Sequence, residues 1–118
     1  MAHSQSQLMF CTYVNSATQE CVFENTKFIT TPDSTHAKLF MFLRSAQVFG
    51  TDKLTFKIYG IDRFDKELYL YSLTQEVQPD WQNSWQPSTF TSPGKYMVKV
   101  YKADTILIAG RGFEFFNY

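Results

Sequence analysis

The chain has 118 residues, of which 44% are hydrophobic and 19% are charged. This length and composition fit one folded domain with its own core and exclude an intrinsically disordered segment. Eleven basic residues balance eleven acidic ones. Because nucleic-acid binding relies on a basic excess, we expect no nucleic-acid partner. No stretch approaches the roughly 20 apolar residues of a membrane-spanning helix, so we expect no membrane span.

Aromatic side chains are the unusual feature of the composition. Twelve Phe, seven Tyr and two Trp make up 18% of the chain. Such residues favour the pleated, half-buried surfaces of β-strands. We therefore expect a strand-rich protein, and we expect some of the rings to be exposed because a small core cannot hide all of them.

Alternation of apolar and polar residues, interrupted by turn residues, predicts nine short strands. In chain order they are expected at 8–14, 21–23, 27–30, 38–43, 53–59, 67–74, 88–91, 95–101 and 105–115, with a bulge or a break at 110–112. Residues 1–7 are expected to be disordered. The best helix candidate is a turn at 80–86, where Trp81 and Trp85 would share one face. The pattern predicts a single all-β domain over residues 1–118, an antiparallel β-sandwich of about seven to nine strands.

The two cysteines, Cys11 and Cys21, bear on the cellular compartment. If the first two strands pair as a hairpin, the cysteines lie nearly opposite each other and could form a disulfide. The alternative is a pair of small buried thiols in a reducing compartment. The N-terminal residues lack the features of a signal peptide. A native N-terminus therefore favours a cytoplasmic protein, and a trimmed chain favours an exported one.

One passage near the C-terminus carries a family resemblance. The run Pro93-Gly94-Lys95-Tyr96-Met97-Val98 resembles the passage that opens the penultimate strand of many immunoglobulin-like domains, including polycystic-kidney-disease-type and fibronectin-type modules. The resemblance covers about the last thirty residues and implies an immunoglobulin-like sandwich. It also implies that Tyr96 ties its hydroxyl group to backbone at the corner of a sheet. The residues expected in the core are Tyr96, Val98, Val100, Phe113, Phe115, Phe56 and Ile58.

Side chains suited to catalysis are few. The histidines are His3, near the N-terminus, and His36, which lies beside Asp33 and Ser34. Three neighbours in one turn do not normally take up the geometry of a catalytic triad. We therefore expect no catalytic residues and no cofactor.

A cluster of carboxylates provides a candidate calcium site. Asp62, Asp65 and Glu67 lie close together in the sequence, and calcium prefers such oxygen ligands. Arg63 and Lys66 interrupt the cluster and would pair with the same carboxylates. A turn that neutralises its own charges is therefore the competing interpretation.

The run Trp81-Gln82-Asn83-Ser84-Trp85 has the strongest functional character. Exposed indoles beside amides would suit a platform for a sugar ring or a protein partner. The alternative is that one or both tryptophans close the end of the core. The candidate binding residues are Trp81, Asn83, Trp85 and Tyr71.

These observations predict a non-catalytic binding or accessory domain that contacts a protein or a glycan through loops or an aromatic face. The alternative is a structural or assembly domain that self-associates through an edge strand or a tyrosine-rich sheet face, composed of Tyr59, Tyr69, Tyr71 and Tyr101. The chain is accordingly expected to be a monomer or a weak homodimer. A third hypothesis is a small sugar-acting enzyme, but no pattern places two carboxylates across a cleft.

Overall fold

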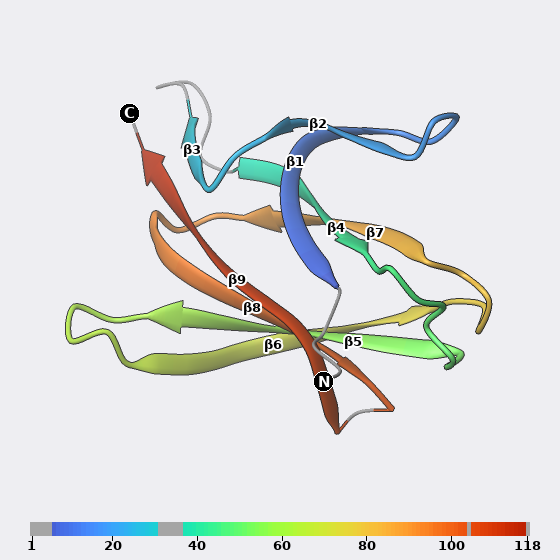
Figure 1. Cartoon of the computed structure of the whole chain (residues 1–118). Helices are drawn as coiled ribbons and strands as arrows, with labels where there is room; N and C mark the ends of the chain where they lie inside the picture. The colour runs from blue at the N-terminus through green and yellow to red at the C-terminus, as the bar shows by residue number, and fades with distance from the viewer. Residues whose placement is uncertain (1–5, 31–36, 104, 118) are drawn as a thin grey trace.

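The computed structural model of the chain describes residues 6–30, 37–103 and 105–117 (Figure 1). Its nine strands are β1 (Gln7–Asn15), β2 (Glu20–Glu24), β3 (Lys27–Thr30), β4 (Ala37–Arg44), β5 (Lys53–Ile61), β6 (Glu67–Glu76), β7 (Asn83–Phe90), β8 (Gly94–Lys102) and β9 (Ile106–Asn117). The described part of the chain holds no helix that could span a lipid bilayer.

The strands form two sheets that lie face to face (Figure 1). The first sheet has the order β2-β1-β4-β7 and the second the order β3-β9-β8-β5-β6. All neighbouring strands are antiparallel except β3 and β9, which run parallel. The predicted β-sandwich is confirmed, with this one parallel pair added. Strand β1 begins at Gln7, which pairs with Arg44, so the expected disordered segment does not extend to Gln7.

The core lies between the two sheets. Inward side chains alternate with outward ones along each strand, as the period of two requires. The seven residues predicted for the core are all buried: Tyr96, Val98, Val100, Phe113, Phe115, Phe56 and Ile58. The first sheet contributes Phe10, Leu39, Met41 and Leu43 to the same cluster. The aromatic excess of the sequence is thus used in part to fill this interior.

Tyr96 lies at the corner where the chain enters β8. Its hydroxyl group donates a hydrogen bond to the backbone carbonyl of Ser92, as the family resemblance implied. Its ring stacks on Phe113 with 5.3 Å between the ring centroids. Burial raises the pKa of the Tyr96 hydroxyl above its ordinary value, and the neighbouring Tyr71 adds to this effect. The side chain therefore joins a turn to the core.

The helical turn expected at 80–86 is wrong. Residues from Asn83 onward form β7, and Trp81 lies in the loop that precedes this strand. Eight residues of β7 pair with β4, including Trp85 opposite Phe42. This ladder pairs one side of the β7 backbone with β4 over eight residues, which gives more stabilisation than two side chains paired four residues apart on an isolated helical turn.

The bulge expected at 110–112 lies two residues earlier. Val100 is opposite Ala109 whereas Tyr101 is opposite Leu107, so Ile108 is the extra residue. Gly112 has a different role, because a Cβ atom at this position would lie only 3.1 Å from the carbonyl oxygen of Tyr96. The glycine allows β8 and β9 to approach closely there.

Cys11 and Cys21 form a disulfide in the structure, with 5.5 Å between their Cα atoms. They are not directly opposite each other, since the register places Glu24 beside Cys11 and Val14 beside Cys21. Figure 1 shows β1 curving where the hairpin with β2 leaves the sandwich. Cys11 and Val14 belong to a second, smaller cluster that also contains Phe42.

Candidate functional site

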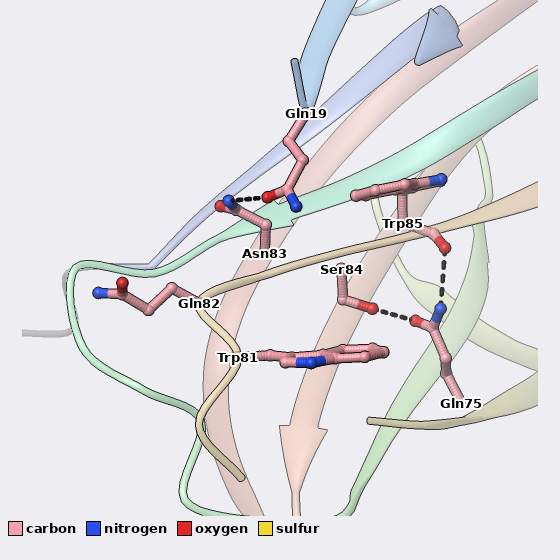
Figure 2. Close-up of a pocket in the computed structure, with 7 residues that line it drawn as sticks. All are labelled: Gln19, Gln75, Trp81, Gln82, Asn83, Ser84 and Trp85. Carbon is pink, nitrogen blue, oxygen red and sulfur yellow. Dashed lines mark hydrogen bonds between the residues drawn. The ribbon is translucent and has the colours of Figure 1, made fainter. Parts of the chain in front are cut away.

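Strands β6 and β7 are edge strands of the two sheets, and side chains link them across one open side of the sandwich. A pocket of about 440 Å³ lies at this side (Figure 2). The residues that line it are Gln19, Gln75, Trp81, Gln82, Asn83, Ser84 and Trp85. Three of the four predicted binding residues therefore line one pocket.

Gln75 of β6 holds the two sheets together beside the pocket. Its side-chain nitrogen donates to the backbone carbonyl of Trp85 at 2.8 Å. Its side-chain oxygen accepts a hydrogen bond from the hydroxyl group of Ser84 (Figure 2). Both ends of this amide are engaged, so Gln75 shapes the wall of the pocket.

Trp81 lies on a loop whose backbone is held by hydrogen bonds at Trp81 itself and at the next residue, Gln82. The carbonyl of Trp81 accepts a hydrogen bond from the amide of Phe49 at 2.8 Å, and the carbonyl of Gln82 accepts one from Ser45 at 2.7 Å. The side chain of Gln82 donates to the carbonyl of Ala46 at 2.9 Å. The indole of Trp81 is nevertheless 45% exposed. An accessible ring is thus held on an ordered backbone.

Trp85 has a different environment from Trp81. Its ring stacks on Phe42, with 5.7 Å between centroids and an interplanar angle of 3°. Arg44 lies over the Phe42 ring at 5.3 Å. Figure 2 shows the two indoles on opposite sides of the β7 ribbon. Trp85 is therefore half-buried on the outer face of the first sheet, and the tryptophans do not form one continuous platform.

Asn83 is oriented by a residue far away in the sequence. Its side-chain nitrogen donates to the side-chain oxygen of Gln19 at 2.7 Å (Figure 2). Gln19 lies in the turn between β1 and β2 with a positive φ of 56°, and its carbonyl accepts a hydrogen bond from Arg44 at 3.2 Å. Sequence reasoning missed Gln19 and Gln75, because no local pattern distinguishes them from other surface glutamines.

Tyr71, the fourth predicted binding residue, does not line this pocket. Its hydroxyl group is 3.2 Å from the hydroxyl group of Ser88 on β7, and its ring packs against the main core. It lies at the seam between the two sheets, the side of the sandwich where the edge strands β6 and β7 are linked by side chains.

No protein-family model and no curated protein matches the sequence. Among solved structures, the chain resembles the crystal structure of an immunoglobulin-like protein from Pseudomonas aeruginosa with a TM-score of 0.58. The likeness covers 98% of this chain and 100% of that one. The chain folds as an immunoglobulin-like sandwich. Because the two sequences are only 14% identical, the likeness shows the fold alone.

The tyrosine-rich face of this immunoglobulin-like sandwich contains three of the four expected residues. Tyr59 and Tyr101 alternate with buried Ile58 and Val100, so they lie on the outer face of the second sheet. Tyr69 meets Tyr59 edge to face at 5.8 Å.

Two lysines lie over these rings, Lys57 at 4.7 Å from the Tyr101 ring and Lys99 at 5.0 Å from the Tyr59 ring. A hydrogen bond to Glu67 raises the pKa of the Lys99 ammonium. Both lysine side chains therefore already interact with rings of the tyrosine-rich face.

Two of the three candidate calcium ligands, Asp62 and Glu67, have other partners. The Asp62 carboxylate accepts hydrogen bonds from the amides of Phe64 at 2.8 Å and Lys66 at 3.0 Å, which closes the turn of the β5–β6 hairpin. Glu67 forms an ion pair with Lys99 at 2.7 Å. Within the described ranges no group of three His, Cys, Asp or Glu side chains could hold a metal ion.

The remaining chemical candidates, His3, Asp33, Ser34 and His36, lie outside the described residues.

Proposed function

We propose that this chain is a non-catalytic binding domain that contacts a protein or a glycan through the pocket beside β6 and β7. The observation that carries the proposal is Trp81, an exposed indole on a loop fixed by backbone hydrogen bonds at the rim of a pocket. Large rings on an ordered backbone provide contact area at a small cost in conformational entropy. The immunoglobulin-like fold supports the proposal, since it is typical of non-catalytic domains.

The proposal is tested by replacing Trp81 with Ala and screening the protein on peptide and glycan arrays. We expect the unmodified chain to bind a subset of the probes and Trp81→Ala to lose that binding. Tyr69→Ala is the matched control, because Tyr69 is also exposed, at 58%, but lies on the other sheet and outside the pocket. Circular dichroism should show that both variants keep the fold. Binding that survives Trp81→Ala, or that Tyr69→Ala abolishes equally, would contradict the proposal.

A further inference from the structure

We infer that the ligand of this pocket is a neutral saccharide, an inference that rests on the function proposed above. The first argument is charge. None of the seven lining residues carries a charged side chain. Three other hollows on the described surface contain charged residues, such as Glu24 with Arg111 and Asp65 with Lys95. An ionic ligand would gain no direct charge partner from the lining of this pocket, whereas a neutral one needs none.

The second argument is the arrangement of polar atoms. The side chains of Gln19, Gln82 and Asn83 are each held by one hydrogen bond to another part of the protein. Within the described residues this leaves the nitrogen of Gln19 and the oxygens of Gln82 and Asn83 without a protein partner. The pocket thus offers both a donor and acceptors on side chains that are already oriented. A sugar hydroxyl group both donates and accepts, so it can pair with either kind of atom.

The third argument is the aromatic surface. The apolar C–H face of a sugar ring can lie against the exposed indole of Trp81 while its hydroxyl groups reach the amides. The pocket volume of about 440 Å³ is in the range of small-ligand sites, which is roughly 300–1,000 Å³. A pocket of this size accommodates part of a glycan chain.

The structure also disfavours the peptide alternative. An extended peptide commonly binds by adding a strand to a free sheet edge, and β7 is the nearest edge of the first sheet. Pro87 lies within β7 and has no N–H group to donate. Gln75 already occupies the carbonyl of Trp85. Strand addition along β7 would therefore lose hydrogen bonds at both positions.

The test compares three probe sets under the same conditions: neutral oligosaccharides of hexose and N-acetylhexosamine, sialylated or sulfated oligosaccharides, and peptides. We expect binding to neutral oligosaccharides that changes little with salt. Trp81→Ala should weaken it roughly tenfold or more, and Asn83→Ala should weaken it by a smaller factor. Tyr69→Ala should leave it unchanged.

A spectroscopic readout identifies the indole that meets the ligand. In the variant Trp85→Phe, Trp81 is the one remaining tryptophan. Titration with the neutral oligosaccharide that binds most tightly should shift the fluorescence emission of Trp81 to shorter wavelength and protect Trp81 from quenching by acrylamide.

The outcomes separate the two proposals. Trp81-dependent binding to peptides only, or to acidic oligosaccharides only, would overturn the saccharide inference and leave the binding function standing. If none of the three probe sets shows binding that depends on Trp81, both the saccharide inference and the proposed binding function are overturned.

Discussion

At the scale of single residues, the two tryptophans show how position decides the role of a side chain. Trp85 falls within β7 and stacks on Phe42 of the neighbouring strand. Trp81 is four residues earlier, in a loop, and keeps 45% of its surface exposed. Identical side chains thus serve packing in one case and are available for contact in the other. The difference arises because β7 begins at Asn83, after Trp81 and before Trp85.

Tyr96 gives a test of the corner hydrogen bond. Tyr96→Phe removes the hydroxyl group that donates to Ser92 and leaves that carbonyl without this partner, while the ring still packs on Phe113. We expect the free energy of unfolding to fall by about 1 kcal/mol or more. Urea denaturation followed by circular dichroism measures the change, and an unaltered midpoint and slope would contradict the role assigned to the hydroxyl.

At the scale of strands, single extra residues decide which side chains share a face. Leu70 is an extra residue in β6, because Ile58 is opposite Tyr71 while Tyr59 is opposite Tyr69. The shift directs Tyr69 to the outer face and Tyr71 to the seam between the sheets. Simple alternation would have placed both tyrosines on one face, which is why the expected four-residue tyrosine face has three members.

The close approach of β8 and β9 can be tested with two glycines of the same strand. Gly112→Ala would place a Cβ atom 3.1 Å from the carbonyl oxygen of Tyr96, whereas the nearest atom to a Cβ at Gly110 is 3.7 Å away. We expect Gly112→Ala to lower the free energy of unfolding by about 1 kcal/mol or more and Gly110→Ala to have little effect. Thermal unfolding of the two variants measures the difference, and equal melting temperatures would argue against a close strand contact at Gly112.

A disulfide links the two strands of the β1–β2 hairpin. Reduction of the bond between Cys11 and Cys21 releases a loop with a sequence separation of 10 residues. We expect a loss of about 2–4 kcal/mol in the free energy of unfolding, because the unfolded chain gains conformational entropy. Thiol titration of the native protein should find no free thiol, and denaturation with and without reductant measures the loss. Two titratable thiols in protein purified without reductant would show that the bond does not form.

At the scale of the whole molecule, the sheet edges bear on self-association. Strand β2 has five residues and β3 has four, both short for an edge that recruits another chain. Strand β7 contains Pro87, and β6 is interrupted by the bulge at Leu70. Short edges, proline and bulges all discourage pairing between molecules. The described edges therefore favour the binding hypothesis over assembly through an edge strand.

We accordingly expect the chain to be a monomer of 13.8 kDa at micromolar concentration, measured by light scattering coupled to size-exclusion chromatography. A measured mass of twice this value would indicate a dimer and contradict the expectation. The exposed side chains of Phe64, Leu68 and Leu70 at the β5–β6 hairpin would then be the first candidate contact. The variant Leu68→Lys would test it, because a charge there should dissociate such a dimer.

The sequence by itself determined the nine-strand pattern, though not the extent of β7, and the seven predicted core residues; the family resemblance added the corner role of Tyr96. Each of these depends on local information: the period of two, the turn residues, and the passage around Tyr96. The sequence also grouped Trp81 with Asn83, its near neighbour in the chain, and both residues line the same pocket.

Only the tertiary structure decided which distant side chains complete that site and which faces the rings occupy. Gln19 reaches Asn83 across 64 positions, and Gln75 reaches Ser84 from the other sheet. The position of the bulge at Leu70 and the start of β7 depend on the register with neighbouring strands. Register is set by long-range pairing and burial, which no short window of the sequence contains.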